Sequence, residues 1–290
     1  ADVTTTGTQT YTGAVTTGSS ALALEATGEG GVSFGSTLTL PAPLTVTTAG
    51  GDIGFAGAVG STSAQPLTVA TGSGTVTFSG SAGTGAAPLG ALSCTGSGMV
   101  SFASAVQAAS IAVAGAAAIE SGASVNTAGT QRYESTVTNN GSISASDAIA
   151  FEGDVTNKGT ITVPPLADGV VALSFARAYN GDEGSLTGAL AANGGQTPNP
   201  VIAFAGDVTL GTFTANGDTV RFTGTASQTL DANEQDFAGV TIASGAAVTL
   251  VGAMSISGNF ENGGSFTAVD PGYQEELLSA AQPFLDDGTL

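Results

Sequence analysis

Residues 74–78 read Gly-Thr-Val-Thr-Phe, a phrase in which apolar residues alternate with small ones. Three related phrases stand nearby: Gly30-Gly31-Val32-Ser33-Phe34, Gly51-Asp52-Ile53-Gly54-Phe55 and Gly98-Met99-Val100-Ser101-Phe102. The four phenylalanines follow one another at intervals of 21, 23 and 24 residues. Alternation with a period of two is typical of a β-strand that buries one face. The repeat therefore predicts short strands that return to the same phase once in every coil of about 18–24 residues.

The aromatic position of this phrase recurs along most of the chain. Tyr11 lies 23 residues before Phe34 in Gln9-Thr10-Tyr11, and Gln131-Arg132-Tyr133 repeats that version. Weaker copies of the phrase end at Phe151, Phe204 and Phe222. Equivalent residues of stacked coils lie over one another, so we expect structural ladders formed by Tyr11, Phe34, Phe55, Phe78, Phe102, Tyr133 and Phe151.

A second repeat is built around asparagine. Val137-Thr138-Asn139-Asn140-Gly141 matches Val155-Thr156-Asn157-Lys158-Gly159 at an offset of 18 residues, and Phe260-Glu261-Asn262-Gly263-Gly264 has the same frame. Stacked asparagines can hydrogen-bond to each other while their side chains also satisfy backbone groups of a tight turn. We therefore expect Asn139, Asn157 and Asn262 to belong to a ladder at a corner of the coils.

These repeats predict an all-β fold, a right-handed parallel β-helix (β-solenoid). A unit of 18–24 residues cannot bury its own apolar face, whereas a stack of such units can. Twelve to thirteen coils with a rise of about 4.8 Å each would give a rod of about 60 Å. The alternative, an antiparallel sandwich, does not require the same residue type at the same phase of every repeat.

The predicted organisation is a single solenoid over residues 1–270, with regular coils at 4–162 and 201–266. Residues 163–200 contain four prolines, and we expect them to form a loop-rich insertion that projects from the rod. Residues 271–290 form the tail. Asp270-Pro271 is a good helix start, and a short amphipathic helix is expected to cap the last coil or to dock onto a partner through Tyr273, Leu277 and Ala281.

Composition excludes several functional classes. Four Lys and Arg residues stand against 23 Asp and Glu, a net charge of −19, so a nucleic-acid binder is excluded. The chain contains no His and one Cys, Cys94, and we expect no cofactor and no metal. Gly, Ser and Thr interrupt every apolar stretch, which argues against a transmembrane segment. No charge lies between Asp52 and Glu120, which indicates either an uncharged polar surface or a surface covered by another subunit.

The best acidic grouping is Glu152-Gly153-Asp154 together with Asp207. Asp154 and Asp207 each follow Gly in a Phe-x-Gly-Asp-Val phrase, which would place them on neighbouring coils. We interpret them as a solvated edge ladder; a metal site and a polysaccharide-cleaving pair of carboxylates are the alternatives. Thr-x-Thr pieces such as Thr45-Val46-Thr47 are similar to those of ice-binding solenoids, but they are not in uninterrupted register. We expect no catalytic residue.

The phrases Thr6-Gly7-Thr8-Gln9-Thr10-Tyr11-Thr12-Gly13-Ala14-Val15 and Thr225-Ala226-Ser227-Gln228-Thr229-Leu230 resemble coils of large bacterial surface proteins. These are proteins of the filamentous-haemagglutinin type and autotransporter passengers, and the resemblance extends over residues 4–266. It implies export, a right-handed β-helix, and adhesion or surface display.

We expect a non-enzymatic, exported structural protein of the bacterial cell surface that assembles with itself into a fibre or sheath. The chain begins at Ala1 without a signal peptide, so either a leader has been removed or the sequence is a piece of a longer protein. The main alternative is an adhesin that binds a surface glycan or protein, and a remote one is a polysaccharide-active enzyme. The expected location is extracellular, at the cell surface, and the expected partners are copies of the same chain.

Overall fold

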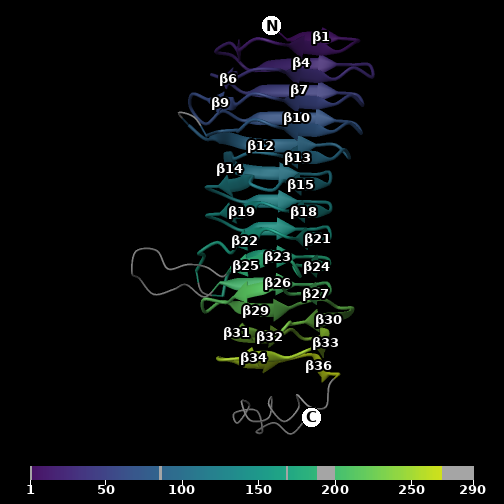
Figure 1. Ribbon diagram of the computed structural model, residues 1–290, viewed down its shortest axis with the longest axis vertical. Coiled ribbons are helices and arrows are strands. Elements are labelled where there is room, and N and C mark those ends of the chain that lie inside the picture. The colour runs from purple at the N-terminus through teal and green to yellow at the C-terminus, as the bar shows by residue number, and fades with distance from the viewer. Residues whose placement is uncertain (1, 85–86, 168, 188–199, 270–290) are drawn as a thin grey trace.

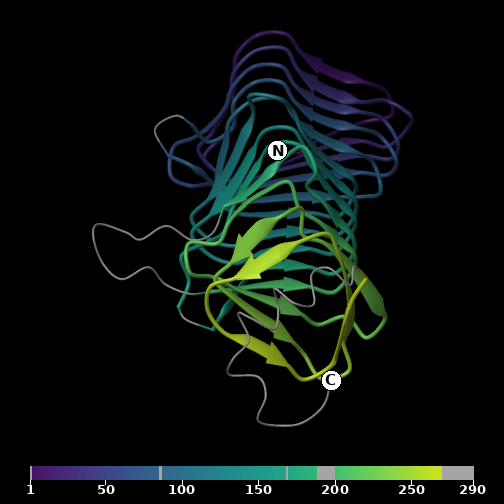
Figure 2. The same ribbon diagram turned by 60° about the horizontal axis from the view of Figure 1, so that its bottom comes forward.

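The computed structural model describes residues 2–84, 87–167, 169–187 and 200–269. Within these ranges the regular elements are all β-strands, and the named strands pair in parallel in a solenoid of about 12 turns (Figure 1). The all-β solenoid predicted from the repeats is therefore confirmed. The coils stack around a common axis, with the N-terminal strands at one end and the C-terminal strands at the other (Figure 2). The tail helix predicted at Tyr273, Leu277 and Ala281 lies outside the described residues.

Each coil has three sides, here called faces A, B and C in chain order. Face A carries the first strand of each coil and extends over the whole length of the solenoid. Its strands are β1 (Val3–Thr5), β4 (Leu22–Ala26), β7 (Leu44–Thr48), β10 (Leu67–Thr71), β12 (Leu89–Thr95), β14 (Val106–Val113), β17 (Gln131–Tyr133), β20 (Ile149–Phe151), β23 (Val171–Phe175), β26 (Val201–Phe204), β29 (Thr219–Phe222), β32 (Gly239–Ile242) and β35 (Phe260–Asn262).

Face B carries the second strand of each coil in one 13-stranded sheet. Its strands are β2 (Gln9–Tyr11), β5 (Val32–Phe34), β8 (Ile53–Phe55), β11 (Val76–Phe78), β13 (Val100–Phe102), β15 (Ala117–Ile119), β18 (Val137–Asn139), β21 (Val155–Asn157), β24 (Tyr179–Asn180), β27 (Val208–Thr209), β30 (Ser227–Asp231), β33 (Ala247–Val251) and β36 (Ser265–Ala268).

Face C completes each coil and is less continuous. It contains β3 (Val15–Thr16), β6 (Leu38–Leu40), β9 (Val59–Ser61), β16 (Ser124–Thr127), β19 (Ser142–Ala145), β22 (Thr160–Thr162), β25 (Ser185–Thr187), β28 (Thr212–Thr214), β31 (Gln235–Phe237) and β34 (Met254–Ile256). Bridges from Val59 to Ala82 and from Ala82 to Val106 carry the pairing from β9 to the first half of β14. Strand β14 then turns from face C into face A, where Ile111 pairs with Gln131.

Coils are numbered from the N-terminal end. Coil 1 is β1–β3, coil 5 ends with residues 106–108 of β14, coil 6 runs from residue 111 through β15 and β16, and coil 7 is β17–β19. In every coil the apolar side chains point inward to one continuous core, and the small polar side chains between them face solvent. This arrangement is the direct consequence of the period of two in the sequence.

The corner between faces A and B is closed by glycines that touch the preceding coil. A Cβ atom on Gly98 would lie 1.7 Å from the carbonyl oxygen of Gly74, and one on Gly74 would lie 2.4 Å from that of Gly51. Backbone therefore packs directly against backbone at this corner, which explains why glycine opens each copy of the repeated phrase.

The region expected to be a loop-rich insertion, residues 163–200, contributes a complete coil. Strand β23 pairs with β20, β24 with β21, and β25 with β22, all in parallel register. Strand β23 has five residues, whereas β24 and β25 have two and three and lie among loop-forming residues. Pro164, Pro165 and Pro200 lie outside these strands, so they do not interrupt the ladder.

The inward phenylalanines of face B should carry much of the stability of the N-terminal coils. We expect Phe78→Ala to lower the free energy of unfolding by about 3–5 kcal/mol, because Phe78 is completely buried and its ring contacts rings in both neighbouring coils. The outward-facing Thr77→Ala in the same strand is the control and should change the urea midpoint very little. Equal effects of the two substitutions would contradict the inward phase assigned to Phe78.

Candidate functional site: the stacking rows and the ends of the solenoid

The first inward row lies on face B and consists of five stacked rings. Successive ring centroids are 5.1, 5.3, 4.7 and 5.5 Å apart, and the rings are within 18° of parallel. The strand pairing places these side chains in one column, in the order Tyr11, Phe34, Phe55, Phe78, Phe102. The spacing of the repeated phrase predicts this row correctly.

A second row of five rings lies on face A of the later coils. Its centroids are 5.1, 5.1, 5.0 and 6.0 Å apart. The column contains Tyr133, Phe151, Phe175, Phe204 and Phe222. The interpretation of Phe151, Phe204 and Phe222 as further copies of the face B position is therefore wrong: these rings follow Val113 on face A.

The change of face has a simple physical reason. Either corner after an inward ring is made by the same kind of phrase, Phe-x-Gly-x-Val, as in Phe55-Ala56-Gly57-Ala58-Val59 and Phe151-Glu152-Gly153-Asp154-Val155. Gly57 lies at the corner from face B to face C, whereas Gly153 lies at the corner from face A to face B. A Cβ atom on either glycine would come within 2.4 Å of the preceding coil. Both corners require a glycine at this position, so the Phe-x-Gly-x-Val pattern does not show which corner follows the ring.

Both rows begin with the same local structure, here called a row head. The hydroxyl of Tyr11 donates a hydrogen bond to Gln9 Oε1 at 2.9 Å, and the hydroxyl of Tyr133 donates to Gln131 Oε1 at the same distance. The residues before them repeat too: Thr5 Oγ1 donates to the carbonyl of Gly7 at 2.7 Å, and Thr127 Oγ1 donates to that of Gly129 at 2.6 Å. The Gln-x-Tyr phrase therefore marks the first ring of a row in both places.

Asn139 and Asn157 form the predicted contact on face B. They are register partners in β18 and β21, and Asn139 Nδ2 donates to Asn157 Oδ1 at 2.7 Å. Asn157 Nδ2 in turn donates to the Tyr179 hydroxyl at 3.1 Å, and both asparagines are buried. Tyr179, which the repeat pattern missed, thus extends the polar ladder into a third coil.

Asn262 does not belong to this ladder. It lies on face A, where it pairs with Ile242, and its side chain is exposed. Its Oδ1 accepts a hydrogen bond from the Gly264 N–H at 3.1 Å, as Asn139 Oδ1 does from Gly141. The shared Asn-Gly frame therefore reports a shared corner turn, which can follow a strand of either face.

Replacing Asn157 by Ala should lower the free energy of unfolding by about 1–3 kcal/mol, since it removes the bond from Asn139 Nδ2 to Asn157 Oδ1 and the amide donor to the buried Tyr179 hydroxyl. Asn262→Ala is the matched control, because it removes the same side chain from an exposed position of the same turn. Its expected effect is within about 0.5 kcal/mol. Urea unfolding of the two variants makes the comparison, and an equal loss would contradict the buried ladder.

Burial controls the titration of three groups in the core. It raises the pKa of the Cys94 thiol to about 12 and the pKa of the Tyr179 hydroxyl to about 12. Burial also raises the pKa of Tyr133, with a smaller contribution from the neighbouring Cys94. The thiol is therefore protonated and unreactive in the folded protein at neutral pH.

The raised tyrosine pKa values make stability depend on pH in alkali. An unfolded tyrosine loses its proton near pH 10, while folded Tyr179 keeps its proton until about pH 12, so unfolding becomes more favourable across this window. The contribution of these tyrosines to stability should be constant below pH 9 and fall between pH 10 and 12 by about 1.4 kcal/mol per pH unit for each such tyrosine. Urea midpoints measured over this range should fall less steeply for Tyr179→Phe than for the wild type. Identical slopes would show that Tyr179 is not the titrating group.

The acidic residues singled out in the sequence do not converge. Asp154 and Asp207 lie two coils apart, with Ala178 between them, and are not on neighbouring coils. Asp154 Oδ1 accepts a hydrogen bond from the Ala178 N–H at 3.2 Å, and Asp207 Oδ1 accepts one from the Thr229 N–H at 2.7 Å. Each carboxylate thus ties its corner to the next coil. Among the described residues no group of three or more Asp, Glu or Cys side chains is arranged to hold a metal ion.

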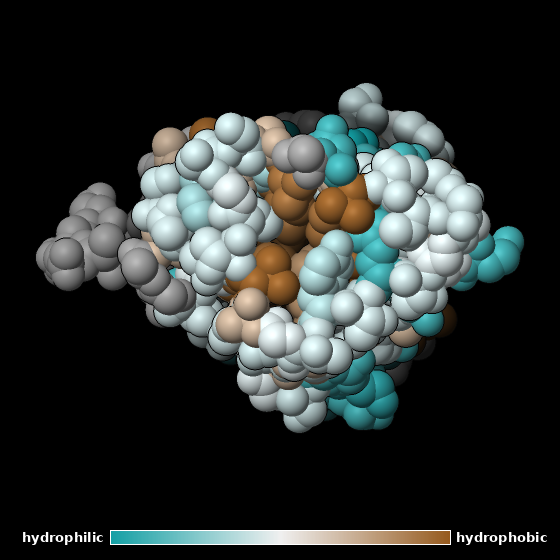
Figure 3. Space-filling view, turned by 90° about the horizontal axis from the view of Figure 1, so that it is seen from above, coloured by the Kyte–Doolittle hydropathy of each residue, from teal (hydrophilic) through white to brown (hydrophobic). Residues whose placement is uncertain are grey.

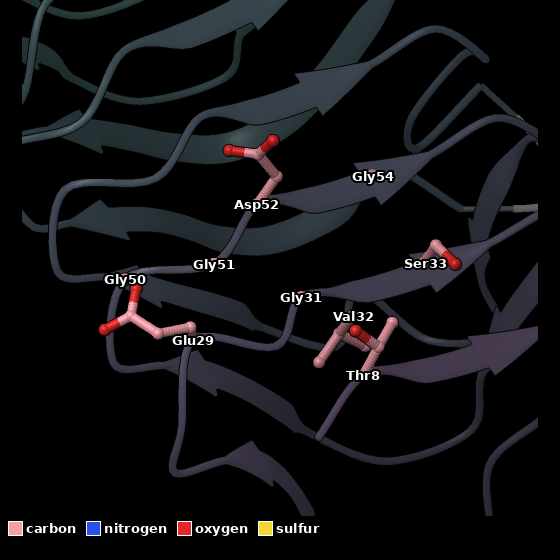
Figure 4. A pocket seen from close by; sticks show the side chains of 9 residues that line it. All are labelled: Thr8, Glu29, Gly31, Val32, Ser33, Gly50, Gly51, Asp52 and Gly54. Atoms are coloured by element: carbon pink, nitrogen blue, oxygen red, sulfur yellow. The ribbon is translucent and has the colours of Figure 1, made fainter. Parts of the chain in front are cut away.

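A surface groove lies at the corner between faces A and B of the first three coils. It has a volume of about 500 Å³ and is lined largely by glycines and small side chains, with Glu29 and Asp52 at its margin (Figure 4). Asp52 Oδ1 accepts a hydrogen bond from the Thr75 N–H at 2.7 Å, so this carboxylate also links its corner to the next coil. Four glycines line the groove, and no hydrogen bond joins its Thr8 or Ser33 hydroxyl to Glu29 or Asp52.

The N-terminal end of the solenoid is a different kind of surface. Seen along the axis, hydrophobic side chains occupy a hollow at its centre, and mostly hydrophilic residues surround them (Figure 3). In β2, Gln9 donates its N–H to Gly31 of coil 2, and Tyr11 accepts from Gly35. Alternate residues of a strand direct their backbone groups to opposite sides, so the N–H and C=O of Thr10 face the end. Within the described ranges, β1, β2 and β3 have strand partners only in coil 2.

No protein-family model matches this chain, and no curated protein or solved structure matches it at a significant level. The solenoid architecture is thus established by the structure, and the filamentous-haemagglutinin or autotransporter type remains a resemblance. The described ranges contain no helix that is long and apolar enough to cross a membrane.

Proposed function

We propose that the protein is a non-enzymatic, exported structural protein of the bacterial cell surface whose solenoids assemble end to end into a fibre or sheath. The observation that carries this proposal is the repetition of the row head. In coil 7 the head stacks on another coil, with Gln131 over Ile111 and Tyr133 over Val113. Coil 1 presents the same head, Gln9 and Tyr11, at the N-terminal end of the described coils.

The backbone between the two residues of each row head also indicates that coil 1 can pair with another coil. In the interior, Arg132 lies between the two head residues and pairs with Ala112 of coil 6. Thr10 holds the equivalent position in coil 1, and its N–H and C=O face the end surface. A strand edge with free donors and acceptors beside an apolar centre is a template for another β-coil. The partner surface that we propose is the outer edge of β34, β35 and β36 in a second copy, where Ile256 and Phe266 are partly exposed.

Two further features support an exported structural role over an enzymatic one. Cys94 is buried as an unreactive thiol, so oxidising surroundings pose no hazard to the fold. The carboxylates of Asp52, Asp154 and Asp207 bond to backbone N–H groups of neighbouring coils, which gives these acids a structural task. The end surface favours assembly over the adhesin alternative, because its backbone edge offers a template for another β-strand.

The test is electron microscopy and analytical ultracentrifugation of the 290-residue chain and two variants. Thr10→Pro removes an N–H that faces the end and leaves the hydrogen bonds from β2 to coil 2 intact. Thr10→Ala, the control, keeps the backbone donor. We expect wild type and Thr10→Ala to form rods that are multiples of one solenoid, about 60 Å each, and Thr10→Pro to stay as single solenoids.

A wild-type protein that stays monomeric at high concentration would overturn the proposal, as would undiminished assembly of Thr10→Pro with unchanged circular dichroism. Antibody labelling of intact producing cells tests the surface location separately. Labelling that requires lysis would contradict export.

A further inference from the structure

Coil 6 separates the two rows of rings. Residues 111–127 contain no aromatic side chain, and their inward positions are occupied by aliphatic residues: Ile111, Val113, Ala117, Ile119 and Val125. On face B the row of rings ends at Phe102 and is followed by Ile119. On face A the row of rings starts only at Tyr133, which follows Val113. Each row has four ring-to-ring contacts of its own, and within the described residues no ring contact spans coil 6.

The two rows also follow the same order of residues. Each begins with the tyrosine of a Gln-x-Tyr head, continues through four phenylalanines, and then reaches an isoleucine and an asparagine. The last two are Ile119 and Asn139 on face B, and Ile242 and Asn262 on face A. The solenoid thus contains two blocks of the same design: block 1 is coils 1–5 (residues 3–108), and block 2 is coils 7–11 (residues 131–237).

The buried polar groups of coil 7 bond away from coil 6. Gln131 Nε2 donates to the Ser144 carbonyl at 2.6 Å within coil 7, and the Tyr133 hydroxyl bonds to Gln131. Asn139 Nδ2 donates to Asn157 and to the Thr160 carbonyl at 3.2 Å, both in coil 8. The buried polar side chains of coil 7 therefore have hydrogen-bond partners without coil 6. The same holds in coil 1, where Gln9 Nε2 donates to the Glu25 carbonyl of coil 2 at 2.8 Å.

Coil 6 contacts coils 5 and 7 through backbone pairing and through side-chain hydrogen bonds on the outer surface. Parallel backbone pairing runs without a gap from coil 5 through coil 6 to coil 7. On the outer surface, Asn126 Nδ2 donates to Ser144 Oγ at 2.9 Å, and Ser101 Oγ donates to Glu120 Oε1 at 3.3 Å. The three ion pairs among the described residues, by contrast, all lie inside block 2 and join Arg132 to Glu134, Arg132 to Glu152, and Lys158 to Glu183.

We propose that coil 6 is a built-in breakpoint, so that blocks 1 and 2 open as separate cooperative units. In a solenoid, stability is close to a sum of terms for each coil and for each contact between neighbouring coils. Aromatic stacking adds to this sum at every step within a block and is missing on both sides of coil 6. Heat, denaturant or pulling force therefore separates the blocks at coil 6, and one block opens while the other keeps its strand pairing.

The test uses a matched pair of substitutions, Phe55→Leu in block 1 and Phe175→Leu in block 2. Each replaces the central ring of its row by a smaller apolar side chain, and both rings are equally buried. Hydrogen exchange followed by mass spectrometry on the full chain should show opening in the substituted block increased by about tenfold, with the other block unchanged within about twofold. The change in protection should fall between residues 108 and 131.

Cys94 supplies an independent readout, since it lies buried in block 1 and reacts with a thiol reagent only when that block opens. Labelling should accelerate in Phe55→Leu and keep the wild-type rate in Phe175→Leu. Exchange that increases equally in both blocks, or labelling accelerated by both variants, would overturn the proposal. Should either variant fail to fold, wild-type exchange in rising urea decides the question, because one cooperative unit would lose protection in both blocks at the same urea concentration.

Discussion

Every coil of this protein is held to its neighbours by parallel backbone hydrogen bonds in fixed register, and the rest of the structure depends on that register. Backbone pairing places each residue beside the equivalent residue of the preceding coil. A side chain therefore packs against the side chain that occupies the same position one coil earlier. Flat rings then stack on rings, and asparagine amides bond to asparagine amides. At the corner between faces A and B, only glycine fits where two backbones meet, as Gly74 and Gly98 do. The stacking rows, the grooves and the end surfaces all follow from this constraint.

The same register explains how the solenoid tolerates variation between coils. A coil needs inward residues that match its neighbours, while the connecting corners can differ in length. Residues 163–200 contribute β23, β24 and β25 to the ladder although they include four prolines. The three faces are also interchangeable as sites for large side chains, since each presents inward positions to one shared core. Rings therefore occupy face B in the first coils and face A in the later ones, and the aliphatic coil 6 lies where neither row is present.

The buried amide side chains and the corner aspartates stabilise the stacking of the coils through hydrogen bonds. The buried side chains of Gln9, Gln131, Asn139 and Asn157 have hydrogen-bond partners, which is the condition for keeping such groups in an apolar core. Aspartates at the corners accept bonds from backbone N–H groups of the next coil. The backbone groups that face the N-terminal end extend the same ladder, which connects the fold to the assembly that we propose.

The sequence by itself determined the strand period, the solenoid class and the five-ring row from Tyr11 to Phe102, because these depend on local alternation and on a repeat of nearly constant length. It also identified the contact between Asn139 and Asn157, since their coils are equal in length. Only the tertiary structure decided which face each later copy occupies. Tyr133, Phe151 and Asn262 carry the same local phrases as their counterparts on face B, yet they lie on face A. The physical reason is that a corner requires the same small residues wherever it occurs, so the number of strands between two copies, and with it the face, is set by the way the whole chain winds.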